Sequence, residues 1–225
     1  MRRLLEGLVR FHNEVYPSKR ELFESLAQKQ TPHSLFITCS DSRIVPDLLT
    51  GAEPGDLFII RNAGNIVPPY GEMNGGVSAT IEYAIMALNI KNIVVCGHSD
   101  CGAMKAVLHP EEVADMPVVA SWLKHAEVAR RVAMANCPDL NSPELLRILT
   151  EENLLAQVSN LRTHPSVAVG LSKGDLTIYA WLYDIERGHV RAFDVTQGEF
   201  VAVSDNGSLP IAAPQPRERV QEVAS

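Results

Sequence analysis

Three short, nearly all-apolar runs constrain the fold of this 225-residue chain more than any other feature. The runs are SLFIT (34–38), DLFII (56–60) and NIVVC (92–96). Such runs are typical of strands that are covered on both faces, as in parallel sheets. The segment between the last two, residues 75–89, has apolar residues at helical spacing. This strand–helix–strand order predicts an α/β fold with a central, mostly parallel β-sheet flanked by helices.

The segments on either side of this unit also have clear patterns. Apolar spacing predicts helices at residues 2–16, 18–29, 117–135 and 143–162. We expect Pro17 to separate the first two helices and Ser18 to cap the second. LTIYAWLYDI (176–185) and HVRAFDV (189–195), joined by a short turn, predict an antiparallel hairpin that ends the sheet at an edge strand.

The chain therefore reads as one domain at residues 1–203, with residues 1–30 as an N-terminal helical arm. Residues 204–225 are rich in proline, serine and charge and have little periodicity. We expect them to form a flexible C-terminal tail.

Charge and cysteine content exclude several classes of function. With a net charge of −7, the chain is not expected to have the basic surface that sequence-independent nucleic-acid binding requires. Docking to an anionic membrane requires the same kind of surface. No apolar run is long enough to predict a transmembrane helix, and the start of the chain reads as an amphipathic helix rather than a signal peptide. Four cysteines are too few for a secreted disulfide scaffold, so we expect a cytoplasmic protein.

Cys39 closes the first apolar run, and CGHSDCG (96–102) closes the third. Ligands bind beyond the carboxyl ends of parallel strands, so Cys39, His98 and Cys101 should meet at one end of the sheet. We expect His98 and Cys101, three residues apart, to share one face of the helix that follows the strand. Two thiolates and one imidazole suit zinc, and three protein ligands with an open position are typical of a catalytic site.

Less specific interpretations remain open at this point. An H-x-x-C pair alone is a weak signal, Cys39 could be a core cysteine, and a Cys39–Cys101 disulfide is allowed by the spacing. Cys96 and Cys137 are expected to be ordinary core cysteines. The remaining histidines have no partner at ligand spacing, and we expect surface or capping roles for His12, His33, His109, His125, His164 and His189.

Asp41 and Arg43 follow the first cysteine closely. Two thiolates cancel the charge of Zn²⁺, so a water on such a site is acidified less than on a three-histidine site and needs help from nearby groups. Asp41 can orient that water, and a bidentate pair with Arg43 would keep the carboxylate from binding the metal itself. The alternative is that both residues cap a helix or form a surface ion pair.

CSDSR (39–43) followed by GHSDCG (97–102) resembles the β-class carbonic anhydrases, which carry C-x-D-x-R and H-x-x-C in this order. RNAGN (61–65), GGVSATIEYA (75–84) and WLYDIE (181–186) extend the resemblance over most of residues 1–200. It implies reversible hydration of CO₂ to bicarbonate and a proton by attack of a zinc-bound hydroxide. It also implies one Zn²⁺ per subunit on Cys39, His98 and Cys101, with Asp41 and Arg43 as a catalytic pair.

The resemblance implies further residues and a partner. Gln30 would bind bicarbonate from across a dimer interface, and Phe58, Tyr83 and Gly102 would contribute to substrate binding, although the two aromatic side chains could simply pack in the core. The helical arm would pack on a partner subunit in a homodimer or a larger homo-oligomer. Phe36 stands where an allosteric branch of the family has tryptophan, so we expect an open site in which Asp41 does not bind the metal.

Three other functions remain as alternatives. The same zinc cluster can hydrolyse CS₂ or COS, and a non-catalytic zinc-stabilised interaction domain would use the same ligands. A thiol redox protein is disfavoured because the chain has no C-x-x-C motif. The sequence leaves open whether the protein serves cyanate metabolism, a carboxysome-type compartment or general bicarbonate supply.

Overall fold

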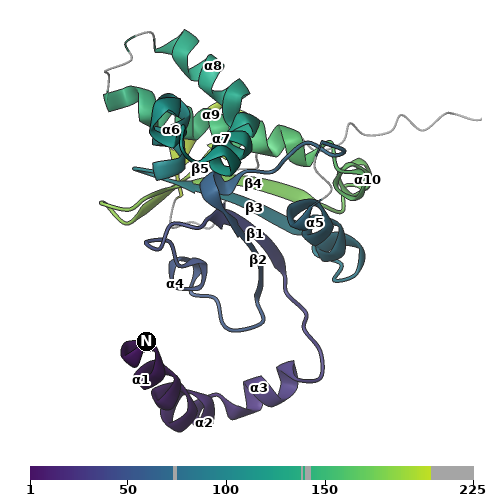
Figure 1. The fold of residues 1–225 in the computed structure, drawn as a ribbon. Helices are drawn as coiled ribbons and strands as arrows, with labels where there is room; N and C mark the ends of the chain where they lie inside the picture. Colours follow the sequence, from purple (N-terminus) through teal and green to yellow (C-terminus); the bar gives the residue numbers. More distant parts are fainter. Residues whose placement is uncertain (73–74, 138, 140–142, 204–225) are drawn as a thin grey trace, which may run out of the picture.

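The computed structural model describes residues 1–72, 75–137, 139 and 143–203 (Figure 1). Within these residues, six strands form one sheet in the order β2-β1-β3-β4-β5-β6. The strands are β1 (Ser34–Cys39), β2 (Leu57–Asn62), β3 (Asn92–His98), β4 (Thr177–Asp184), β5 (His189–Asp194) and β6 (Glu199–Ala202). β2, β1, β3 and β4 are parallel, while β5 and β6 are antiparallel additions. The predicted mostly parallel sheet is confirmed, but the edge strand is β6, one strand beyond the predicted hairpin.

The helices lie mainly in the connections between parallel strands. The N-terminal arm contains α1 (Arg2–Arg10), η1 (Phe11–Val15), α2 (Tyr16–Ser18) and α3 (Arg20–Leu26), and the β1–β2 and β2–β3 connections contain α4 (Pro46–Thr50), η2 (Ala63–Asn65) and α5 (Gly76–Met86). The β3–β4 connection contains α6 (Gly102–Leu108), η3 (Pro110–Val113), α7 (Pro117–Leu123), η4 (Lys124–Ala126), α8 (Glu127–Asn136), α9 (Pro143–Leu161) and α10 (Pro165–Lys173). The sequence analysis did not predict α4, α10 or β6, and it expected a helix after β3 without giving the bounds of α6, because each of these elements is too short to show a clear period.

The two faces of the sheet are covered unequally. Residues of β1 and β3 alternate between the faces, so that Leu35 and Ile37 pack with α5, α9 and α10 in one large core. Phe36 and Cys96 point to the opposite face, where a smaller cluster includes Leu49 of α4. Figure 1 shows α4 on that side of the sheet and α9 on the other side.

The N-terminal arm differs from its prediction. The helix continues through Pro17, and the break comes at Lys19, whose φ is −122° and ψ 24°. The Ser18 hydroxyl does not cap α3 but donates to the carbonyl of Val15 at 2.7 Å. Pro17 lies two residues after the π-helical segment η1 and two residues before the break at Lys19, so it stands near the end of this continuous helix. Figure 1 shows the arm set apart from the sheet, and α1 buries none of its residues.

Two further expectations concern the ends of the chain. The predicted C-terminal tail, residues 204–225, lies outside the described residues. Among the helices that the structure describes, none combines the length and apolar content that a membrane span requires.

Candidate metal centre

The carboxyl ends of β1 and β3 lie side by side and carry the three candidate metal ligands. Cys39 ends β1 and His98 ends β3, and Cys101 follows three residues later. The two Sγ atoms are 4.0 Å apart, and the Sγ and imidazole nitrogen atoms of the trio all lie within 4.8 Å of one another. All three side chains are buried. The trio therefore has the proximity and the donor types of a Zn²⁺ site with one position left open.

Cys101 reaches this position by a turn and not along a helix face, as the sequence analysis expected. His98 is the last residue of β3, and Cys101 is the N-cap residue of α6 with an extended backbone. The turn between them contains Asp100, whose φ of +57° lies in the left-handed region. The sharp turn brings Cys101 back to Cys39, beside His98 at the end of β3.

The imidazole of His98 is oriented as a metal ligand requires. Its Nδ1 lies 2.8 Å from the Ser99 carbonyl oxygen, which can only accept a hydrogen bond, so Nδ1 carries the proton. Nε2 is therefore left with a free lone pair, and this atom is buried without a hydrogen-bond partner. A buried polar atom without a partner is costly, and a metal ion on Nε2 would remove that cost.

The two thiols share a hydrogen bond, so the protonation of each depends on the other. A hydrogen bond from Cys101 is the main cause that lowers the pKa of Cys39, helped by His98 and the backbone amide of Gly64. The hydrogen bond to Cys39 in turn raises the pKa of Cys101, with burial as the second cause. Binding of a metal ion displaces the proton of this hydrogen bond, since metal ligands must be thiolates. All four cysteines of the chain are free thiols in the structure, so the disulfide alternative is not what forms here.

Asp41 lies at the mouth of the cluster and is held by Arg43. Arg43 Nε donates to Asp41 Oδ1 at 3.0 Å and Nη2 to Oδ2 at 2.8 Å, and the Arg43 backbone amide donates to Oδ1 at 2.9 Å. These bonds hold the pKa of Asp41 well below its usual range. Asp41 Oδ2 is 3.8 Å from His98 Nε2. Neither residue lies in a helix or caps one, so the capping alternative is wrong.

Two further side chains that the sequence analysis did not single out secure this pair. Asp100 Oδ2 accepts from Arg43 Nη1 at 3.1 Å, its carbonyl accepts from Nη2 at 3.1 Å, and Lys105 forms an ion pair with the same carboxylate. Arg61 donates to the carbonyls of Cys39 and Asp41. A signal for Arg61 was present, because RNAGN begins in the last two residues of β2 and so lies at the same edge of the sheet as Cys39.

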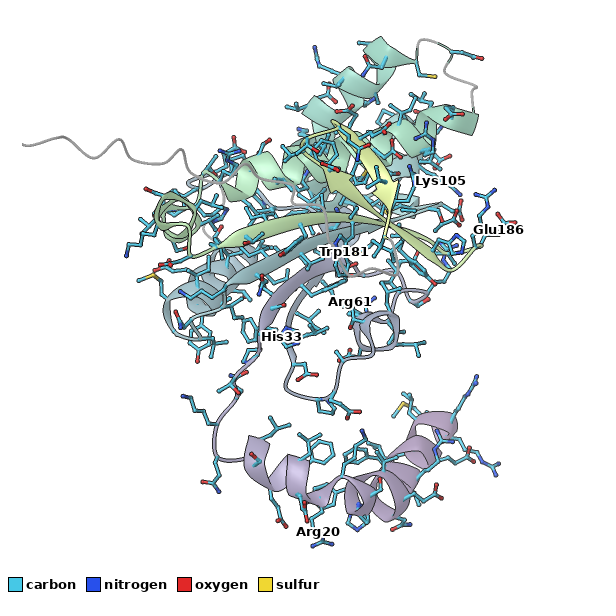
Figure 2. The ribbon with its side chains drawn as sticks, turned by 180° about the vertical axis from the view of Figure 1, so that it is seen from behind. Arg20, His33, Arg61, Lys105, Trp181 and Glu186 are labelled. Atoms are coloured by element: carbon cyan, nitrogen blue, oxygen red, sulfur yellow. The ribbon has the colours of Figure 1, made fainter. Side chains whose placement is uncertain are left out.

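Three of the predicted substrate residues do not lie beside the cluster in their own chain. Phe58 pairs with Leu35 while Asn62 pairs with Cys39, which puts Phe58 about 13 Å along the strand from the Cys39 level. The rings of Tyr83 and Phe58 contact each other in a tilted arrangement, with centroids 6.0 Å apart. Gln30 is exposed in the linker that enters β1 at its amino end. Figure 2 shows this separation through two labelled neighbours, His33 at the linker and Lys105 beside the candidate metal centre.

Gly102, the fourth predicted substrate residue, does lie beside the cluster. It is exposed, follows Cys101 directly and begins α6. A Cβ atom added at Gly102 would meet no other atom within 4 Å, so the space in front of this backbone is open.

The other predicted roles for cysteine and histidine are partly corrected. Cys96 is fully buried, which raises the pKa of its thiol to about 12, as expected for a core cysteine. His164, however, is not a surface residue: it is buried, and its Nε2 lies 3.1 Å from the Pro68 carbonyl. His164 lies at the start of α10 and packs against the loop that contains Pro68, which explains why it is buried.

The chain is similar to known proteins over most of its length. The model of the carbonic anhydrase family matches residues 34–190. A carbonic anhydrase of Pseudomonas aeruginosa is 47% identical over 220 residues, covering 98% of this chain and 100% of that protein. The solved structure of the β-carbonic anhydrase CcaA is 48% identical with a TM-score of 0.88, covering 90% and 99% of the two chains. Structures of two tetrameric β-carbonic anhydrases from Sordaria macrospora match at 28% identity and a TM-score of 0.77, covering 85% and 95%.

Proposed function

The chain belongs to the β-carbonic anhydrase family, and from that premise we propose how its own residues carry out the reaction. The enzyme catalyses the zinc-dependent, reversible hydration of CO₂ to bicarbonate and a proton. The observation that carries the assignment of residues is the meeting of Cys39, His98 and Cys101 beside a restrained carboxylate. A zinc-stabilised interaction domain would have no use for that carboxylate.

Cys39, His98 and Cys101 are the proposed zinc ligands. When bound, zinc supplies a water molecule that is acidified enough to act as a nucleophile at mildly alkaline pH. The proton on His98 Nδ1 is held by the Ser99 carbonyl, which leaves Nε2 to donate its lone pair. Three ligands leave one position facing Asp41.

Asp41 orients the reacting water, and Arg43 keeps Asp41 in place. The carboxylate is ionised at every pH at which the enzyme works, because Arg43 lowers its pKa, so it accepts a hydrogen bond and does not donate one. Both carboxylate oxygens are already occupied by Arg43, which opposes their direct approach to the metal. Arg43 is itself fixed by Asp100, so the carboxylate is held through two successive contacts.

We propose that Gln30, Phe58 and Tyr83 act in the site of a partner subunit, and that Gly102 borders the site of its own chain. The first three gather near the amino ends of β1 and β2, away from their own Cys39. β2 is an edge strand with one free side, and the apolar side chains of α1 are exposed, including Leu4, Leu5, Leu8 and Val9. Burial of that face on a second copy would supply the missing apolar contact.

A homodimer or a multiple of it follows from this proposal, as in the tetrameric relatives. In this arrangement residues 1–203 form the catalytic domain, with residues 1–30 as the arm that contacts the partner. We also propose a cytoplasmic location, where the ligand thiols Cys39 and Cys101 stay reduced.

Co-expression of two impaired variants tests the shared site. Gln30→Ala removes the side chain that we assign to the partner's site. Asp41→Asn removes the carboxylate that acts in the site of its own chain. A mixed dimer contains one undamaged site out of two. Random pairing makes about half of the dimers mixed, so co-expression should restore about a quarter of wild-type activity. Differently tagged chains, purified in two steps, isolate the mixed dimer. If that dimer is no more active than the two parent variants, Gln30 does not act across the interface.

A further inference from the structure

The loop that follows β2 is held almost entirely by side chains. Residues 64–68 are buried, yet only η2 gives this stretch any regular backbone structure. Its carbonyl groups accept hydrogen bonds from the side chains of Trp122 (to Ala63, 2.8 Å), Asn153 (to Gly64, 3.1 Å), Asn62 (to Ile66, 2.9 Å), Asn160 (to Val67, 2.9 Å) and His164 (to Pro68, 3.1 Å). Buried carbonyls need such partners, so these bonds fix where the loop lies.

This loop donates a hydrogen bond to the candidate metal centre. The backbone N–H of Gly64 donates to Cys39 Sγ at 3.4 Å. Gly64 has φ +79°, and a Cβ there would lie 3.0 Å from the Met104 side chain and 3.1 Å from Ala103. Another residue here would be strained by the positive φ and would push these two side chains of α6 aside. The position of the Gly64 peptide decides whether its N–H points at the sulfur.

The Gly64 N–H belongs to the peptide group that joins Ala63 to Gly64, whose carbonyl accepts from Trp122, and Asn153 of α9 holds the carbonyl on the other side of the Gly64 Cα. Its side chain is fully buried, and its Nδ2 donates to the Gly64 carbonyl at 3.1 Å. Its Oδ1 accepts from Gln157 Nε2 at 2.8 Å, and Gln157 Oε1 accepts from the Val67 amide at 2.8 Å. The side chains of Asn153 and Gln157 thus bond to the loop and to each other. This network holds the amide of Asn153 in one orientation.

α9 is itself fixed against the strand that ends in His98. A Cβ on Gly97 would lie 3.3 Å from the Leu154 side chain, so α9 approaches β3 as closely as a glycine allows. Asn153 is next to Leu154 in α9. The helix that positions the Gly64 peptide and the strand that carries His98 are therefore one packed unit.

We propose that Asn153 is a positioning residue of the zinc centre: through Gly64 it keeps a hydrogen bond on the Cys39 thiolate and so weakens the electron donation of that sulfur. The effect matters because two thiolates cancel the charge of Zn²⁺. Hydrogen bonds to ligand sulfur are an established way in which a protein tunes a metal. The proposal rests on the assignment of Cys39 as a zinc ligand and adds a residue that does not touch metal or substrate.

Cobalt substitution gives a direct test. In Asn153→Ala the Gly64 carbonyl loses its partner, so Gly64 is held less firmly and its N–H can turn away from Cys39. The sulfur then becomes more electron-rich, and the thiolate-to-cobalt charge-transfer band should move to longer wavelength. The pH of half-maximal kcat for CO₂ hydration by the zinc enzyme should move upward. Asn160→Ala is the matched control, because it removes the same type of bond, from the same helix to the same loop, at Val67 instead of Gly64.

The outcomes separate a positioning role from a structural one. A band and a pH profile that move in Asn153→Ala but stay at wild-type values in Asn160→Ala support the proposal. Equal movement in both variants, or movement in neither, overturns it. Asn153→Ser, which keeps a small polar group for Gln157, gives the same comparison if the alanine variant does not fold. An inactive but zinc-loaded wild type would instead contradict the proposed function.

Discussion

The guanidinium of Arg43 occupies both carboxylate oxygens of Asp41, with bonds of 3.0 Å from Nε to Oδ1 and 2.8 Å from Nη2 to Oδ2. Asp41 Oδ2 is at the same time 3.8 Å from His98 Nε2, the atom proposed to bind zinc. A carboxylate this close to a metal is itself a good ligand. The pairing with Arg43 therefore keeps the Asp41 carboxylate from binding the metal, so that the fourth coordination position stays open.

Removal of Arg43 should close the site. In Arg43→Ala we expect Asp41 to become the fourth ligand, which changes the visible spectrum of the cobalt-substituted enzyme and lowers kcat/KM by about a hundredfold. The double variant Asp41→Ala/Arg43→Ala is the control, because without a carboxylate the spectrum should return to the wild-type form. A single variant with an unchanged spectrum would show that Arg43 does not restrain Asp41.

Asp100 should share in this restraint, since it accepts from Arg43 through both its side chain and its carbonyl. Asp100→Ala leaves the carbonyl bond, so we expect a smaller loss of kcat/KM than for Arg43→Ala, about tenfold. Lys105→Met is the matched control, because it removes the other partner of Asp100 and leaves the contacts of Arg43 intact. Equal losses in the two variants would mean that Asp100 acts only through local charge.

Zinc content should separate the ligand cysteines from the core cysteine. Cys39→Ser should lose nearly all its zinc, because the alcohol is a much poorer ligand than a thiolate. Cys96→Ser changes a fully buried thiol on the opposite face of the sheet and should keep one zinc per chain. Atomic absorption on both purified variants gives the answer. Full occupancy in Cys39→Ser would remove Cys39 from the ligand set.

His164 should make the folded state less stable as the pH falls. Burial lowers the pKa of its imidazole, so below the usual value of about 6.5 the unfolded chain takes up a proton that the folded chain does not. The stabilisation is therefore complete above that pH and is lost as the pH falls toward the lower folded pKa. In His164→Gln, which keeps a donor for Pro68, the urea midpoint should vary less between pH 7.5 and 5.5. An identical pH dependence in both proteins would contradict this.

The sheet and the ligand trio could be predicted from the sequence because both depend on short-range patterns. The fully apolar runs of β1, β2 and β3 identified parallel strands, and their shared carboxyl edge brought Cys39 to His98. The pairing of Asp41 with Arg43 followed from their spacing and their charges. The roles of these residues in catalysis stay predictions until the variants are measured.

Long-range contacts and local backbone choices could not be read in this way. The left-handed turn at Asp100 replaced a predicted helix face, because the sequence pattern does not show which residues adopt positive φ. The bond from Asn153 to Gly64 joins residues 89 positions apart, and its partner is a backbone carbonyl without a side-chain signal. Pro17 was expected to separate two helices, but the helix runs through it from η1 into α2 and breaks only at Lys19.

Stopped-flow measurement of CO₂ hydration from pH 6 to 9, on protein with a measured zinc content, tests the central claim most directly. The account predicts catalysis in proportion to bound zinc, with kcat rising toward alkaline pH and with loss of activity in Asp41→Ala despite full zinc occupancy. Zinc-replete protein that gives no acceleration at any pH in this range, or an Asp41→Ala variant with wild-type rates, would contradict it.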